Sequence, residues 1–321
     1  MFSFSDARFG LGRVIRRVRG ALFYPHWMVG VVDQPIENAL GWTEMPPVRW
    51  VEAFDRTRTL AAPFPWPGSP DTFVCENFDL KVHQARLAAV KLDANGIAAE
   101  VNLDVPLSAP LSFPFLFMRD GIVYAMPESS ASRRLEIFRW QEHDGTWAPH
   151  AVVFEDKPVF NAVLFEKDGW FWIAYTDLTQ TPQDNLNLMY SSRLAGPWRH
   201  HAANPVQTGR EASLNGGPFF EVDGRLYRPA QDCSEVQGGA LRIREVVVCT
   251  PLAYKERNVT RIVPSSSAYP DGFHTLTAWG DKCLVDGMRL TFSLRHLWHR
   301  MGRRLRHEEA FLRRSAGRAR P

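Results

Sequence analysis

The chain has little cysteine, and its cysteines form no pattern with a recognisable chemistry. The four are Cys75, Cys233, Cys249 and Cys283. None belongs to a C-x-x-C pair, and no histidine cluster stands at zinc-ligand spacing, so the sequence predicts no metal site. We expect free thiols in a reducing compartment and therefore a cytoplasmic protein.

Motifs for nucleotide and serine-hydrolase chemistry are also missing. The sequence contains no G-x-x-x-x-G-K, no G-x-G-x-x-G and no G-x-S-x-G, so we expect no cofactor. It has no apolar run of about 18 residues, the length that indicates a transmembrane helix. The N-terminus has basic residues without an uninterrupted apolar core, which argues against a signal peptide.

Charge is distributed unevenly, although the formal net charge is only +3. Ten Arg and two Glu lie between Arg289 and Pro321, and residues 1–27 contain five Arg and one Asp. Apolar residues recur three or four apart in the C-terminal stretch, so we expect a short basic amphipathic α-helix there. This helix either packs on the rest of the chain or anchors it, as a peripheral protein, to an anionic membrane surface. We predict no binding to nucleic acid, because no reader fold surrounds the helix.

Three stretches share one pattern: an apolar strand, an Asp-Gly pair, an aromatic-rich strand and a polar group. The pairs are Asp120-Gly121, Asp168-Gly169 and Asp223-Gly224, about 48 and 55 residues apart. Asp-Gly between two apolar runs is a strong hairpin signal, because both turn residues need positive φ. Another short strand follows each hairpin. A unit of about four strands that recurs at this spacing is typical of a β-propeller blade.

Two weaker units lie upstream, so the predicted fold is an all-β, five-bladed β-propeller with the short basic C-terminal helix. The upstream strands are expected at 27–32 with 49–54, and at 71–78 with 85–92. A β-sandwich also has many short strands, but it rarely repeats one hairpin in the same register. The predicted domains are a basic N-terminal segment (1–24), the propeller (25–289) and the basic helix with its tail (290–321).

The sequence between about residues 25 and 290 resembles a known family. The stretches MPESSASRRLEIFRW (126–140) and LYRPAQDCS (226–234) are similar to blades of the N-terminal propeller of plant glucosamine inositolphosphorylceramide transferases. A wider resemblance links the chain to the five-bladed propellers of glycoside hydrolase families 32, 43, 68 and 117. These resemblances imply glycan handling, with a site at one end of the central channel where inner strands of different blades end.

Cleavage of a glycosidic bond usually needs two carboxyl groups, an acid with a raised pKa and a base or nucleophile. The candidate catalytic residues are Glu76, Glu128 and Asp232. Glu128 is either the catalytic acid or a structural group that caps backbone N–H groups or pairs with Arg133 or Arg134.

Other polar residues near the predicted strand ends are candidates for substrate binding. They are Asp71, Asn161, Arg228, Gln231 and His274. Arg228 either clamps an anionic sugar or phosphate through its planar guanidinium or pairs with Asp232. His274 either donates a proton or only forms hydrogen bonds within the core. Several tryptophans either stack on sugar rings or pack internally, namely Trp66, Trp170, Trp172 and Trp198.

Two positions depart from the pattern of the hydrolase families. Many relatives carry Ala-Asp-Pro-Phe near the start of the second blade, where this chain has Ala62 in AAPF. Many also carry Val-Asp in the fourth blade, where this chain has Phe160-Asn161. Methyl and amide groups cannot act as general bases, so the departures put hydrolysis in doubt and leave binding intact.

Two functional hypotheses therefore stay open. The first is a carbohydrate-active propeller, like a glycosidase or transglycosylase, that handles a surface or lipid-linked glycan. The second is a catalytically degenerate glycan-binding or scaffolding module that assists a partner glycosyltransferase. A WD-type interaction propeller is disfavoured, because the sequence lacks the G-H and W-D pairs of those repeats.

Overall fold

The computed structural model describes residues 23–51, 57–82, 84–94, 96–181 and 183–292. One compact unit spans Trp27–Met288, and a second consists of Met1–His26 with Arg289–Pro321. Nearly all of the predicted N-terminal segment (1–24) and C-terminal helix (290–321) lies outside the described residues. Within the described ranges, no helix has the length and apolar character needed to cross a membrane.

Four antiparallel sheets follow one another along the chain. Blade 1 contains β3 (Arg58–Pro65), β4 (Thr72–Asp79), β5 (Gln84–Asp93) and β6 (Gly96–Asn102). Blade 2 contains β7 (Ser112–Arg119), β8 (Ile122–Glu128), β9 (Leu135–Gln141) and β10 (Thr146–Phe154). Blade 3 contains β11 (Val159–Lys167), β12 (Trp170–Asp177), β13 (Asn185–Ser191), β14 (Arg199–His200) and β15 (Gln207–Thr208). Blade 4 contains β16 (Leu214–Asn215), β17 (Phe220–Val222), β18 (Arg225–Asp232), β19 (Ala240–Cys249) and β20 (Tyr254–Ile262).

Blade 5 is built from both ends of the described chain. Its strand order is β2 (Arg49–Trp50), β1 (Phe23–Val32), β22 (Lys282–Phe292) and β21 (Leu276–Trp279). The 3₁₀ helix η1 (Ile36–Gly41) lies between β1 and β2 in the sequence. The sequence had placed residues 27–54 in a blade of their own, whereas β1 pairs with β22 and closes the ring. The pairing of β1 with β22 thus joins the two ends of the described chain in one sheet.

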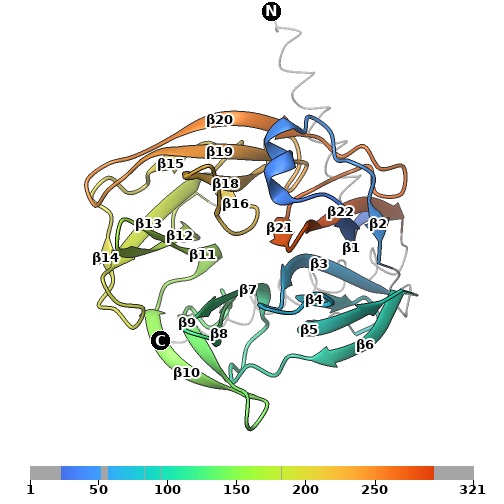
Figure 1. The fold of residues 1–321 in the computed structure, drawn as a ribbon, viewed down its shortest axis with the longest axis horizontal. Coiled ribbons are helices and arrows are strands. Elements are labelled where there is room, and N and C mark those ends of the chain that lie inside the picture. The colour runs from blue at the N-terminus through green and yellow to red at the C-terminus, as the bar shows by residue number, and fades with distance from the viewer. Residues whose placement is uncertain (1–22, 52–56, 83, 95, 182, 293–321) are drawn as a thin grey trace, which may run out of the picture. The chain divides into compact units, whose positions relative to one another are not determined.

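Figure 1 shows the five sheets around a common centre, with β3, β7, β11, β16 and β21 nearest to it. The Asp-Gly turns form as predicted, because all six of their residues have positive φ: 50° and 74° at Asp120-Gly121, 51° and 77° at Asp168-Gly169, and 49° and 71° at Asp223-Gly224. The prediction of an all-β, five-bladed propeller is therefore confirmed, and the sandwich alternative is excluded.

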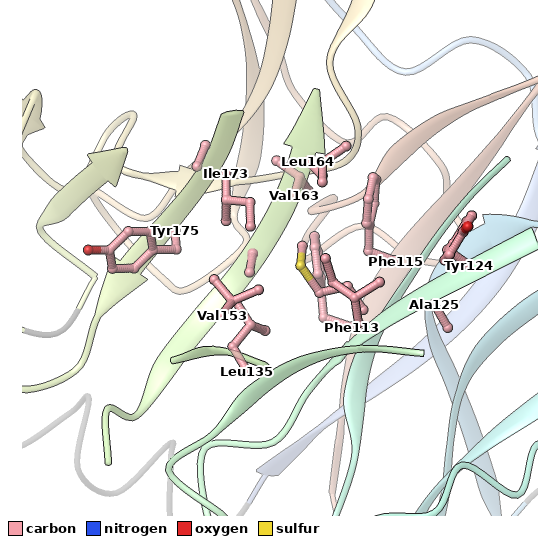
Figure 2. Close-up of a cluster of buried hydrophobic side chains, with 14 of the residues drawn as sticks. Phe113, Phe115, Tyr124, Ala125, Leu135, Val153, Val163, Leu164, Ile173 and Tyr175 are labelled. Carbon is pink, nitrogen blue, oxygen red and sulfur yellow. The ribbon is translucent and has the colours of Figure 1, made fainter. Parts of the chain in front are cut away.

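Apolar side chains fill the space between neighbouring blades. Figure 2 shows part of this core between blades 2 and 3, where Phe115, Leu135, Val163 and Ile173 are at most 2% exposed. Full burial of one such side chain contributes about 1.5–3 kcal/mol. This packing holds the blades at fixed positions and so fixes the inner strands whose residues face the centre.

Candidate functional site

Three inner strands contain a kink at equivalent positions. Ala62 in β3, Phe113 in β7 and Asn161 in β11 have φ of 48°, 42° and 49°. At each kink the inner strand carries one residue more than its partner strand, which is a β-bulge. A left-handed backbone costs a non-glycine residue about 1–2 kcal/mol, so each kink requires a stabilising contact.

A carboxylate from the preceding blade supplies that contact in all three cases. The pairs are Ala62 N with Asp286 Oδ2 (3.0 Å), Phe113 N with Glu76 Oε1 (2.8 Å) and Asn161 N with Glu128 Oε2 (2.8 Å). A hydrogen bond contributes about 0.5–1.5 kcal/mol, and about 1.5–3 kcal/mol where the acceptor is charged, which is of the same size as the backbone strain. The three acids therefore link blade 5 to blade 1, blade 1 to blade 2 and blade 2 to blade 3.

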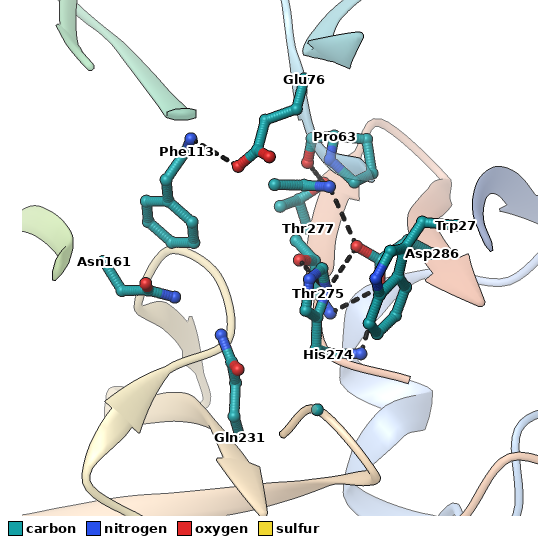
Figure 3. A network of polar contacts seen from close by, with 12 residues as sticks. Trp27, Pro63, Glu76, Phe113, Asn161, Gln231, His274, Thr275, Thr277 and Asp286 are labelled. Carbon is teal, nitrogen blue, oxygen red and sulfur yellow. Dashed lines mark hydrogen bonds and ion pairs between the residues drawn. The ribbon is translucent and has the colours of Figure 1, made fainter. Parts of the chain in front are cut away.

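Five side chains, one from each blade, surround the centre of the propeller. Figure 3 shows Glu76, Phe113, Asn161, Gln231 and His274 facing one another across this space, and we call them the axial ring. Phe113, Asn161 and Gln231 are buried, at 3%, 9% and 2% exposure, whereas Glu76 and His274 are partly exposed. The fold thus brings four of the predicted site residues together from distant parts of the chain.

His274 is held by an acidic partner that the sequence reading missed. Its Nδ1 lies 2.6 Å from Asp286 Oδ2, and its ring stacks on Trp27 with centroids 3.8 Å apart. Asp286 Oδ1 also accepts the backbone N–H groups of His274 (3.1 Å) and Thr275 (2.9 Å). Burial alone would lower the pKa of His274, but the charge and hydrogen bond of Asp286 outweigh it and raise that pKa.

Glu76 and Glu128 lie on either side of one dipeptide. Glu76 binds the N–H of Phe113, and Glu128 Oε1 accepts a hydrogen bond from Ser112 Oγ at 2.9 Å. Burial raises the pKa of Glu128 to about 8, against the opposing hydrogen bond from Asn161, and the charge of Glu76 adds to the rise. Burial also raises the pKa of Glu76. At neutral pH a large fraction of Glu128 is therefore uncharged.

The sequence left two structural roles open for Glu128, a cap of backbone N–H groups or a pair with Arg133 or Arg134. The structure contains the cap, on the N–H of Asn161. Arg133 Nε lies 2.5 Å from Asp156 Oδ1, and Arg134 Nε lies 2.7 Å from Glu136 Oε1, so these arginines pair elsewhere. Glu128 is 5% exposed. The cap is compatible with a second, chemical role, which stays a prediction.

Asn215 connects the ring residues of blades 3 and 4. Its backbone oxygen accepts hydrogen bonds from Asn161 Nδ2 (2.9 Å) and Gln231 Nε2 (3.0 Å). Its own Nδ2 donates to the backbone oxygens of Asn161 (2.7 Å) and Ala174 (3.0 Å). These reciprocal bonds fix the orientation of both amides toward the centre.

Arg228 lies behind the ring and is fully occupied by protein partners. Its side chain is 0% exposed, and it binds both carboxylate oxygens of Glu256, at 2.6 and 2.8 Å. Its remaining contacts are Asn215 Oδ1 (3.2 Å) and the backbone oxygen of Ala212 (2.7 Å). The Arg228–Asp232 pair considered from the sequence is replaced by this bidentate pair with Glu256.

Asp232 and Asp71 lie apart from the axial ring. Asp232 Oδ2 binds Arg261 Nε (2.8 Å) and Arg242 Nη2 (3.1 Å) of the outer strands. Burial alone would raise the pKa of Asp232, but hydrogen bonds from Ser234 and Arg261 hold it below its ordinary value. Asp71 belongs to the turn before β4. Direct contact of either residue with a substrate in the ring is not supported by these positions.

Asp286 is the acid that the sequence reading missed. It lies in β22 within the run CLVDGM (283–288) and is 0% exposed. An acidic residue inside an otherwise apolar strand is a signal for a paired, buried carboxylate. The Asp-Gly repeat does not indicate Asp286, because the turn of its hairpin is Gly280-Asp281 instead of Asp-Gly. No three His, Cys, Asp or Glu side chains of the described ranges are grouped as metal ligands would be.

The comparison with protein families agrees with the resemblance noted in the sequence. The family described as "Glucosamine inositolphosphorylceramide transferase 1, N-terminal" matches residues 75–273. The chain belongs to this family. The matched range contains Glu76, Glu128, Asn161 and Gln231, and it ends directly before His274.

Curated relatives of the chain carry the same name. Glucosamine inositolphosphorylceramide transferase 1 of Oryza sativa subsp. indica is 32% identical over 151 residues, which is 46% of this chain and 20% of the relative. The protein of that name from Arabidopsis thaliana is 30% identical over 177 residues, 54% of this chain and 23% of the relative. The chain thus matches only about a fifth of the length of these relatives.

A solved glycoside hydrolase overlaps the propeller in part. The xylan β-1,4-xylosidase of Bacillus halodurans superposes with a TM-score of 0.47 and 15% identity, covering 68% of this chain and 51% of that one. A likeness this low says nothing about the activity of the present chain.

Proposed function

We propose that this propeller binds a glycan, or the sugar headgroup of a glycolipid, at the axial ring and presents it to a glycosyltransferase. The observation that carries the proposal is the convergence of one side chain from each blade on a single centre. Sugar sites contain a few fixed donors and acceptors, and the ring brings amide, imidazole and carboxylate groups together. The transferase name of the relatives supports the same ligand class.

Binding without cleavage fits the state of the carboxylates better than hydrolysis. Both oxygens of Asp286 and both oxygens of Glu128 already accept hydrogen bonds from the protein. Hydrolysis needs an acid and a base that can both exchange protons with substrate or water. Glu76 is the acid of the axial ring and is partly exposed, whereas the neighbouring acids Glu128 and Asp286 are 5% and 0% exposed.

Glycosidic cleavage is the second candidate, and the pKa of Glu128 favours it. A carboxyl with a pKa of about 8 is largely protonated at neutral pH, as a general acid must be. Glu76, on the other side of Ser112–Phe113, would then be the base. Product analysis separates the candidates: released sugar that disappears in Glu128→Gln, with binding retained, would establish cleavage.

The test of the proposal is a screen of the purified full chain on a printed oligosaccharide array. Glu76→Gln and His274→Gln should each weaken the strongest signals about tenfold or more, because each removes one charged hydrogen-bonding group. Glu245→Gln is the matched control, since Glu245 pairs with Arg257 in blade 4 (2.6 Å) and lies outside the ring. Equal binding by the wild type and both ring variants would refute the proposal.

A further inference from the structure

A second hollow lies away from the axis, between blades 1 and 2. It is a groove of about 670 Å³ whose walls come from the turn after β3, the end of β6 and the β9–β10 hairpin. Its volume falls within the range of about 300–1,000 Å³ that small-molecule sites occupy. None of its lining residues belongs to the axial ring, so it is a separate feature of the molecule.

Three tryptophans form the aromatic part of the groove. The centroid of the Trp66 ring lies 5.2 Å from that of Trp140 and 6.0 Å from that of Trp147, and the last two are 5.1 Å apart. The planes are steeply inclined, at 57° to 85° to one another, so the rings present faces in different directions. Trp140 and Trp147 are cross-strand partners in β9 and β10, which fixes their spacing.

The rest of the lining mixes small apolar residues with polar ones and is almost free of charge. Its polar residues are Ser69, Thr72, Asn102 and Thr146, and its one ionisable residue is Asp104. Hydroxyl and amide groups beside indole faces match the surface of a pyranose, which has apolar C–H faces and a rim of hydroxyls. A charged ligand, such as a phosphate or an acidic peptide, finds no cation among these lining residues.

Four hydrogen bonds link the residues of the turn that carries Trp66. Trp66 N donates to Thr72 O (2.9 Å) and Ser69 N donates to Trp66 O (3.0 Å). Asp71 Oδ1 accepts the hydroxyls of Ser69 (2.9 Å) and Thr72 (2.8 Å). Asp71, predicted as a substrate-binding residue, thus orients two lining groups of this groove. Such preorganisation lowers the entropic cost of binding.

Trp147 carries a buried donor beneath the groove that lacks a partner among the described residues. Trp147 is 6% exposed, and its Nε1 has no hydrogen-bond partner within the described part of the chain. A buried N–H without an acceptor costs about 1–3 kcal/mol, so Trp147 lowers the stability of this wall, and only Trp66 and Trp140 offer a partly exposed indole to the groove.

We propose that this groove is a second glycan-binding site, which holds a neutral pyranose segment on the partly exposed indoles of Trp66 and Trp140. It is independent of the axial ring, although a long glycan bound at both sites would gain affinity from the two contacts together.

The array of neutral oligosaccharides used for the ring also tests the groove, now with two kinds of variant. Trp140→Ala removes one stacking face, and Thr146→Arg fills the groove from an exposed position without disturbing the core. Each should lower binding of groove ligands at least tenfold, and that loss should also occur in the Glu76→Gln background. Trp170→Ala, a partly buried tryptophan of blade 3, and Glu142→Arg, in the same hairpin but outside the lining, are the matched controls.

The outcomes for the two sites differ. Binding that is lost in Glu76→Gln and His274→Gln but unchanged in Trp140→Ala and Thr146→Arg would overturn the groove site and leave the ring. Binding lost only in the groove variants would support the groove and refute the ring. A proline-rich peptide is probed in parallel: if Thr146→Arg blocks the peptide and no oligosaccharide depends on the groove, the groove is a peptide site and the proposal fails. Melting curves show whether each variant is folded. If Trp140→Ala does not fold, the binding measured with Thr146→Arg decides whether the groove is a glycan site.

Discussion

Glu128 makes the stability of the propeller depend on pH in a direction that one substitution should abolish. Burial raises the pKa of Glu128 from 4.5 to about 8. Between these values the unfolded chain releases a proton that the folded chain keeps. The free energy of unfolding therefore falls as pH rises from 4.5 to about 8. Below this window the carboxyl is protonated in both states, and its contribution no longer changes with pH.

The size of the effect follows from the shift. One pKa unit corresponds to about 1.4 kcal/mol, so the full shift corresponds to about 5 kcal/mol. Glu128→Gln places an uncharged group of the same size in the site and keeps an oxygen that can accept the N–H of Asn161. We expect the variant to match the wild type at about pH 5 and to exceed its free energy of unfolding by about 4 kcal/mol at about pH 8.5.

Urea unfolding of both proteins at the two pH values measures this difference. Glu136→Gln, at a buried acid of the same blade that pairs with Arg134 at 2.7 Å, is the control for the loss of a carboxyl group in this blade. A difference between the wild type and Glu128→Gln that is the same at both pH values would refute the assignment of an uncharged, desolvated Glu128.

Three further predictions concern other parts of the chain. Arg228→Met should lower the free energy of unfolding by about 3–5 kcal/mol, seen as a lower thermal midpoint, because Glu256 would stay buried without its partner; adding Glu256→Gln should recover part of the loss. By NMR titration the pKa of His274 should lie above 6.5 and fall in Asp286→Asn, and the stability that the pair adds should be lost as pH rises through that pKa; an unchanged value would remove the ion pair. Deleting residues 293–321, which spares β22, should abolish cosedimentation with phosphatidylserine vesicles, and retained binding would reject the basic tail as a membrane anchor.

The hairpins of the fold could be predicted because their signal is local. Asp-Gly pairs require positive φ at two adjacent residues, and that requirement is visible in the sequence. The closing blade could not be predicted in the same way, because β1 pairs with β22 across nearly the whole described chain and neither strand carries a turn signal that names its partner. Residues 27–54 were therefore read as a separate unit.

The candidate site shows the same division between local and long-range information. Asn161 and Gln231 were predicted near strand ends, and the axial ring contains both. Arg228 is paired with Glu256 of β20, and Asp232 is paired with Arg242 of β19 and Arg261 of β20. Such pairings across outer strands have no local sequence signal, so the sequence left both residues open as ligand contacts.

The most direct measurement is a diffraction structure of the protein with the oligosaccharide that binds most strongly on the array. We predict a sugar ring at the propeller axis, with hydroxyl oxygens within hydrogen-bond distance of the Glu76 carboxylate and the His274 imidazole. An empty axis in a complex whose sugar lies elsewhere on the protein, or an array on which no oligosaccharide binds, would contradict a glycan site built by the five converging blades.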